Sequence, residues 1–330
     1  MKYQISEESS RKIVSLSFLC AVLICAAHVQ WTPLDQYGPV LWFCRKCFGD
    51  PALSFFFIVS GFFLARHYEE PGWWWAAIRK RIGTILVPYT VWQFVNAIAW
   101  FAIDHRWALR PGGFGLNPFI APKLVPLWYL RNLMLLVVIS PLIFACLKRW
   151  GWRVLAWIFA AWLVLAGVME VGVFPDGSRM GGFLRGTFTP NGLFTFTLGA
   201  YLAGHPMTLS RRAGRWCGVA ALVLVFVRLL LFYLAVPVPF AVVVPASLMT
   251  LAFVWTHVPA FGLPKALARS VFPIYLMHAI ILQTVCRQIF PWSPFTPVEE
   301  LLLGIGGSIV ISELLHRFLP RVARFVFGGR

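Results

Sequence analysis

The sequence predicts an all-α fold, a polytopic bundle of about ten transmembrane helices with both termini in the cytoplasm. Of its 330 residues, 59% are hydrophobic and 12% are charged, whereas a soluble domain has about 25% charged residues. The mean hydropathy is +0.75. The apolar residues fall into runs long enough to cross a bilayer, and the basic residues gather between those runs.

Ten apolar runs meet the requirement of about 17–25 residues for a membrane-spanning helix. They lie near 13–31, 49–66, 82–103, 125–146, 154–174, 189–204, 216–235, 239–259, 270–288 and 299–319. The longest outer loops, near 104–124 and 174–188, are rich in Gly and Pro. Since no polar segment of the sequence is long enough to fold alone, we expect one integral-membrane domain over residues 1–330.

The basic residues predict how the bundle lies in the membrane. Nineteen of the 29 Lys and Arg residues fall on the side that holds both termini, and eight fall on the other side. Cytoplasmic loops carry the excess of positive charge, so we expect both termini in the cytoplasm. Topology therefore explains the net charge of +17, and no nucleic-acid partner is expected. The two remaining arginines, Arg131 and Arg228, lie inside spans.

The first apolar run, 13–31, carries His28 near its far end. This run is longer than the core of about 7–15 residues in a signal peptide, so we expect it to remain as the first span. An ionisable side chain inside a span is costly, which favours a functional role. The alternative is a structural histidine that bonds to a backbone carbonyl. On a helix, His28 would share one stripe of small residues with Ser17, Ala21 and Cys25.

No metal site is expected. The seven cysteines are scattered through the spans, apart from Cys44 and Cys47, which form a lone CxxC. A structural zinc ion needs four ligands, and this pair does not supply them. A strained disulfide in an outer loop is the alternative to an incidental spacing.

A series of fragments in a fixed order resembles the acyltransferase type 3 family of membrane acyltransferases. The chain reads SLSFLCAVLICAAH at 15–28 and LSFFFIVSGFFLAR at 53–66. It continues with IRKRIGTILVPY at 78–89, PLWYLRNL at 126–133 and SPLI at 140–143. The last two matches are FTLGAYLAG at 196–204 and FPIYLMH at 272–278. The resemblance covers nearly the whole chain, and the ordered series is more specific than any single fragment.

The resemblance implies a bundle of about ten helices that transfers an acyl group, usually acetyl from acetyl-CoA, to a hydroxyl of an envelope or exported glycan. The family's first-helix histidine, regarded as the catalytic base, corresponds to His28. The family also commonly has an arginine eleven residues earlier, where this chain has Ser17. Eleven residues are three helical turns, so both positions share a face. Because serine carries no charge, Arg11 or Lys12 are candidates to replace that arginine in binding CoA.

Two matched segments supply candidates for binding the acyl donor. Ser60 and Gly61 match the family's SGF signature and would contact the donor or orient His28, although helix packing by small residues is the alternative. A cluster of three cations lies at the expected cytoplasmic face, where it suits the phosphates of CoA or simply controls topology. These cations are Arg79, Lys80 and Arg81.

Four further candidates lie in the segments WYLRNL and FPIYLMH, namely Trp128, Arg131, Tyr275 and His278. Arg131 should face a polar interior or pair with an acid, because it lies inside a span. His278 is expected to bind substrate or to complete a buried network with Tyr275, and a structural hydrogen bond is the alternative. The acids that would pair with a buried histidine or arginine are Asp104, Glu170 and Glu313.

The sequence therefore predicts an O-acyltransferase of the bacterial inner membrane, with His28 as general base. The expected co-substrate is acetyl-CoA or another acyl-CoA, and no permanently bound cofactor is expected. The other expected partners are the lipid bilayer and a glycan or lipid-linked sugar acceptor, while protein partners are unknown. The main alternative is a transporter or glycan-exporting permease built on the same bundle. A catalytically inactive assembly partner is a third possibility, suggested by Ser17.

Overall fold

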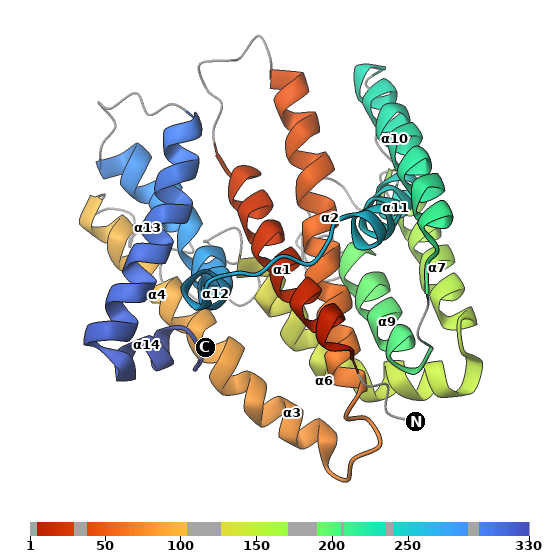
Figure 1. Ribbon diagram of the computed structural model, residues 1–330, viewed down its shortest axis with the longest axis horizontal. Helices are drawn as coiled ribbons and strands as arrows, with labels where there is room; N and C mark the ends of the chain where they lie inside the picture. Colours follow the sequence, from red (N-terminus) through yellow and green to blue (C-terminus); the bar gives the residue numbers. More distant parts are fainter. Residues whose placement is uncertain are drawn as a thin grey trace. The chain divides into compact units, whose positions relative to one another are not determined.

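All regular structure in the described part of the chain is helical. The computed structural model describes residues 5–29, 38–103, 127–170, 190–205, 208–234, 240–289 and 297–329. A helix lies at each of the ten predicted ranges (Figure 1). Six described helical segments are long and apolar enough to cross a membrane, namely Glu7–Ala26, Cys47–Ala65, Trp73–Ala99, Trp128–Trp150, Arg211–Leu231 and Lys265–Cys286. The all-α prediction is confirmed for these residues, and ten spans with cytoplasmic termini stay predictions.

The helices divide into two compact units, each assembled from separate stretches of the chain. The first unit comprises Met1–Ser17, Lys46–Trp74 and Leu136–Gly262. The second unit comprises Phe18–Arg45, Trp75–Leu135 and Leu263–Arg330. Because the boundaries cut through helices such as α1 (Glu7–Ala26) and α6 (Trp128–Trp150), these helices contribute residues to both units.

Glycines allow close backbone contact inside the first unit. A Cβ at Gly61 of α2 (Gly38–Ala65) would overlap the backbone oxygen of Phe196 in α9 (Pro190–Gly204). Reciprocally, a Cβ at Gly199 would overlap the backbone of Ile58. These two helices therefore touch through their backbones, as small residues permit in membrane proteins. The remaining helices of this unit are α7 (Arg153–Glu170), α10 (Arg211–Tyr233) and α11 (Phe240–His257).

The first unit also contains a buried ion pair. The Arg228 guanidinium on α10 donates to the Asp50 carboxylate on α2 at 2.7 Å, and their side chains are only 5% and 17% exposed. An arginine inside a span must reach water or a partner. Arg228, predicted to lie in a span, therefore has its charge compensated by Asp50, an acid that we did not expect as a partner.

The second unit is built around α12 (Lys265–Ile280), whose residues from Phe272 to Ile280 are all buried. α12 continues into a π-helical segment, η5 (Ile281–Ile289), and packs against α13 (Pro297–Phe318). A second π-helical segment, η2 (Ile82–Leu86), joins α3 (Trp73–Arg81) to α4 (Val87–Ile103). π-helical turns are rare and frequently occur at functional sites.

The chain's last helix, α14 (Pro320–Val326), packs on α4 within the second unit. The Trp92 indole on α4 donates to the backbone oxygen of Val326 at 3.0 Å. Its ring stacks on the fully buried Phe327, with 6.2 Å between centroids. Phe327 also stacks on His316 of α13 at 5.7 Å. Aromatic contacts therefore attach the C-terminal helix to both α4 and α13.

Candidate active site

His28 lies in a turn just after α1, which differs from the prediction that the helix continues to residue 31. The helix ends at Ala26, and the amides of His28 and Val29 bond to Cys25 and Ala26, three residues back. Cys25 and Val29 are fully buried against Leu282 of η5. Packing on both sides of the turn therefore fixes the backbone that carries His28.

The His28 ring is oriented by its own backbone. Its Nδ1 donates to the carbonyl oxygen of Ile24 at 2.7 Å. A neutral imidazole with a protonated Nδ1 carries its lone pair on Nε2. This is the hydrogen bond expected of a structural histidine. It also fixes the tautomer that a general base needs, in the way that a carboxylate or carbonyl does in other enzymes.

His278 repeats the same arrangement on α12. Its Nδ1 donates to the carbonyl oxygen of Ile274 at 2.9 Å, and its side chain is fully buried. The two histidine rings meet edge to face, with 5.1 Å between centroids. The Nε2 atom of His278 is buried and has no hydrogen-bond partner among the described residues. The structure therefore brings together the two histidines that the sequence singled out, as a pair with matching tautomers.

Three tyrosines extend this histidine pair across the second unit. Tyr275, one turn before His278 on α12, lies 6.2 Å from it between ring centroids. Tyr275 also contacts Tyr129 of α6 edge to face at 5.6 Å. It interacts electrostatically with both Tyr129 and Tyr89 of α4. Tyr275 and His278 are therefore in ring contact, and Tyr129 and Tyr89 adjoin them.

Arg131 joins this network through neutral groups. Its guanidinium donates to the side-chain oxygen of Asn132 at 3.2 Å and interacts electrostatically with Tyr89. Trp128, three residues earlier, lies half-buried at the start of α6. Arg131 therefore faces a polar interior, the first of the two environments predicted for it.

The three candidate cations after Trp75 have different surroundings. Arg79 and Lys80 are exposed, and the Arg79 guanidinium lies over the Trp75 ring at 5.5 Å. Arg81 is partly buried and interacts electrostatically with Tyr129. Of the three, Arg81 is the one that the structure connects to the tyrosines and, through them, to the histidine pair.

Ser60 and Gly61 belong to the first unit, whereas the histidine pair belongs to the second. The backbone contact of Gly61 with Phe196 supports the packing alternative for the SGF signature. Ser60 is half-buried on α2. The structure therefore gives Gly61 a packing contact inside the first unit.

The three N-terminal positions considered for CoA binding make local contacts within the first unit. The Ser17 hydroxyl donates to the backbone oxygen of Ile13 at 2.7 Å. Arg11 lies 4.0 Å from Glu7, and the Lys12 ammonium lies over the Trp255 ring at 5.4 Å. Neither cation is shown in contact with the network around His28.

Of the three acids proposed as partners of a buried histidine or arginine, Glu313 has a described side chain, and its described partner is Arg269. On the partly exposed surface of the second unit, the Glu313 carboxylate accepts from the Arg269 guanidinium at 2.7 Å. Asp104 and the side chain of Glu170 lie outside the described residues. The side chain of Cys44 does too, so the CxxC predictions stay untested. Among the described residues, no cluster of three or more His, Cys, Asp or Glu side chains could hold a metal ion.

The sequence analysis missed Gln93 and Asn132, two buried amides in this network. A signal for Gln93 was present, since Tyr89, Gln93 and Asn96 recur at helical spacing in an otherwise apolar run. The sequence carries no such signal for Asn132, because it directly follows Arg131, the residue in that segment that is the candidate. Its role appears only once its contacts are known.

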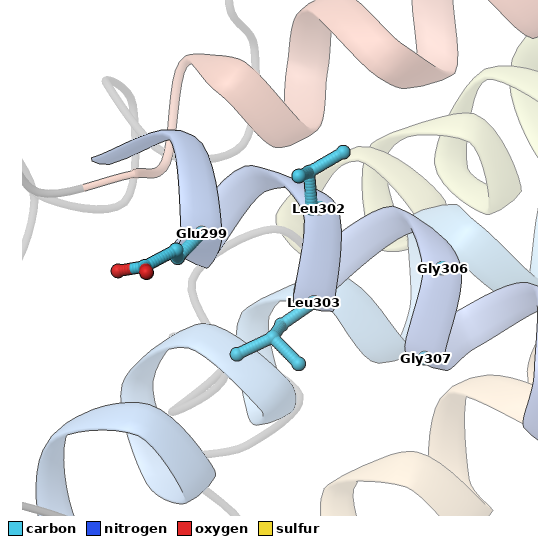
Figure 2. Close-up of a pocket in the computed structure, with 5 residues that line it drawn as sticks. All are labelled: Glu299, Leu302, Leu303, Gly306 and Gly307. Atoms are coloured by element: carbon cyan, nitrogen blue, oxygen red, sulfur yellow. The ribbon is translucent and has the colours of Figure 1, made fainter. Parts of the chain in front are cut away.

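A hollow on the exposed face of α13 is distinct from this network. It is lined by Glu299, Leu302, Leu303, Gly306 and Gly307 (Figure 2). All five residues come from one helix, and Leu302 is 65% exposed. This lining offers one exposed carboxylate and no cation to bind phosphates, whereas the histidine pair adjoins arginines, so the histidine pair is the candidate active site.

These features define a helical membrane protein with a buried histidine pair and an adjoining polar network. A family model for an acyltransferase domain, that of acyltransferase type 3, matches residues 16–317. The chain belongs to this family. Together with the six apolar helices, the family supports an integral-membrane acyltransferase. Neither the comparison with curated proteins nor that with solved structures found a match.

Proposed function

We propose that this protein is an O-acyltransferase of the bacterial inner membrane that transfers an acetyl group from acetyl-CoA to a hydroxyl of an envelope or exported glycan. The observation that carries the proposal is the hydrogen bond that sets the tautomer of His28, in which the Nδ1–H donates to the backbone oxygen of Ile24. This tautomer carries its lone pair on Nε2, the atom with which a general base takes a proton.

In the proposed reaction, Nε2 of His28 takes the proton from the acceptor hydroxyl while the oxygen attacks the thioester carbonyl carbon. The tetrahedral intermediate collapses, the C–S bond breaks, and the CoA thiolate leaves. His28 returns the proton to the thiolate sulfur, so the products are an O-acetyl ester and free CoA. Arg131 is our candidate for stabilising the developing oxyanion, because it carries positive charge in the network of Tyr89 and Tyr275.

Replacement of His28 by alanine tests this proposal. The protein is assayed in membranes of its host with acetyl-CoA labelled in the acetyl group, at matched levels of inserted protein. We expect labelling of glycan to fall by about 10²–10⁴-fold, the usual contribution of a general base. Labelling by His28→Ala at the wild-type level would refute the assignment of His28 as the base. If the wild type itself transfers no acetyl group, the result would favour a catalytically inactive assembly partner.

The same assay separates an enzyme from the permease alternative. An acyltransferase consumes the thioester and releases one free thiol for each ester formed. A permease moves a solute across the membrane without consuming acetyl-CoA. Movement of glycan with no release of CoA would therefore overturn the proposed reaction and favour transport.

A further inference from the structure

Two buried amides, Gln93 and Asn132, lie in the unit that also holds the histidine pair. α4 presents Tyr89, Gln93 and Asn96 to the interior of the second unit, and these side chains are 2%, 8% and 2% exposed. They recur at spacings of four and three residues, so they form one polar stripe on a helix that is otherwise apolar. Burying such a stripe costs free energy unless its groups find partners.

Gln93 and Asn132 each carry a buried amide nitrogen that has no hydrogen-bond partner among the described residues. The side-chain oxygen of Asn132 accepts from Nε and Nη2 of Arg131, at 3.3 and 3.2 Å. Gln93 shares a side-chain hydrogen bond with Tyr89. The Nδ2 of Asn132 and the Nε2 of Gln93 are both buried without a partner among the described residues. Both side chains thus offer N–H donors, and nothing in the second unit's described residues accepts them.

These two amides branch from a series of interactions that joins a cation to the histidine pair. Arg81 interacts with Tyr129, and Tyr129 contacts Tyr275, which lies beside His278. Tyr89 links Gln93 and Arg131 to this series, because it interacts with both Arg131 and Tyr275. All of these residues belong to the second unit.

A ligand with two hydrogen-bond acceptors between an anionic end and a reactive end would satisfy both N–H donors. The pantetheine arm of CoA has this chemistry, since it carries two amide carbonyls between the diphosphate and the thiol. An unpaired buried donor costs free energy that a carbonyl oxygen recovers. A simple hydrocarbon chain would leave both donors unpaired.

We propose that Gln93 and Asn132 bind the two amide carbonyls of the pantetheine arm, with Arg81 toward the phosphates and the His28–His278 pair toward the thioester. This inference rests on the proposed function, because it takes an acyl-CoA as the donor. It adds a binding site for the middle of the donor, made of two residues that have no role in proton transfer.

Equilibrium binding to the purified full-length protein tests the site without any need for the acceptor. The probes are CoA, pantetheine and 3′-phospho-ADP, which keeps the phosphates of CoA and lacks the pantetheine arm. The variants are Gln93→Met and Asn132→Leu, which keep the volume and remove the donors. The control is Thr90→Val on the same helix, where the lost hydroxyl donates to its own helix at Leu86.

We expect each amide substitution to raise the Kd for CoA and for pantetheine about tenfold, because one hydrogen bond at a buried site is lost. Binding of 3′-phospho-ADP should not change. Arg81→Gln should show the opposite pattern, in which CoA and 3′-phospho-ADP bind more weakly and the binding of pantetheine is unchanged. The control variant should bind all three probes as the wild type does. If either amide variant fails to accumulate, Gln93→Glu or Asn132→Asp replaces it.

Three results would overturn the inference while leaving the proposed function intact. One is wild-type binding of pantetheine by both amide variants. Another is an equal loss of all three probes. A third is unchanged binding of CoA by the amide variants together with a different defect. Weaker binding of succinyl-CoA would assign the amides to a charged acyl group, and a lower kcat would assign them to the oxyanion. Failure of the wild type to bind any probe would instead refute acyl-CoA as the donor.

Discussion

The two units treat buried charge in different ways. In the first unit, the guanidinium of Arg228 is matched by the carboxylate of Asp50 at 2.7 Å, so a full ion pair is completed within the protein. In the second unit, Arg131 donates to the neutral amide of Asn132, and the amide nitrogens of Asn132 and Gln93 find no acceptor among the described residues. Buried polar atoms without a described partner also occur in the first unit, at Ser54 and His257. The difference therefore lies in the partner of the arginine, which is a carboxylate in the first unit and a neutral amide in the second.

The comparison extends to the backbone. Helices α2 and α9 of the first unit are in direct backbone contact at Gly61 and Gly199. The second unit contains two π-helical segments, one before Tyr89 and one after His278. The first unit therefore has features of a packed scaffold, and the second has features of a reaction site. Substitutions at these contacts of the first unit should lower stability, and those at the histidine pair of the second unit should lower activity.

The largest effect outside the His28 test is expected at Asp50. Asp50→Ala leaves the Arg228 guanidinium buried without its carboxylate, which should cost about 3–5 kcal/mol of unfolding free energy. Thermal unfolding in detergent micelles measures the loss. The double variant Asp50→Leu with Arg228→Met should recover most of it, because the uncompensated charge is gone. An unchanged midpoint in Asp50→Ala would contradict a structural role for the pair.

A smaller effect is expected at Gly61, again on stability. Gly61→Ala places a methyl group against the backbone oxygen of Phe196, which should cost about 1–3 kcal/mol, as overpacking does. The matched control is Gly83→Ala in the second unit, where no heavy atom lies within 4 Å of the added Cβ. Activity per folded molecule should stay the same in both variants. A loss of activity in Gly61→Ala at full stability would instead favour donor binding by the SGF signature.

The kinetics of a His278 variant test whether the histidine pair of the second unit acts in catalysis. His278→Ala removes the ring that contacts His28 at 5.1 Å, so the base should be held less well in its reactive orientation. We expect kcat to fall about tenfold, about 1.4 kcal/mol, with little change in KM for acetyl-CoA. Measuring both constants is decisive, because a purely structural histidine would lower the amount of folded protein and leave the kcat of the folded fraction unchanged.

The smallest effect is expected at the C-terminal attachment. Trp92→Phe keeps the aromatic stacking on Phe327 and removes the hydrogen bond to Val326, so it should cost about 1 kcal/mol of stability. A small fall in the unfolding temperature, with unchanged kcat, is the expected result. A change in kcat would show that α14 influences the histidine pair of the same unit.

Much of the site could be predicted from the sequence because its residues are unusual where they stand. His28, Arg131 and His278 are ionisable or polar residues in apolar runs, and the bilayer makes such residues conspicuous. The SGF glycine was also conspicuous, but its motif could not distinguish donor binding from packing. Only its neighbour, the backbone of Phe196 from a segment far along the chain, favours packing.

The sequence by itself determined the all-α class, the positions of the helices and the family, because apolar runs and matched segments are local properties of the chain. The tertiary structure decided which polar residues meet. It paired Arg228 with Asp50, placed His28 in a turn beside His278, and joined Asn132 and Gln93 to one network. Each of these contacts joins residues from distant segments or depends on a side-chain orientation, so hydrophobic periodicity alone could not reveal them.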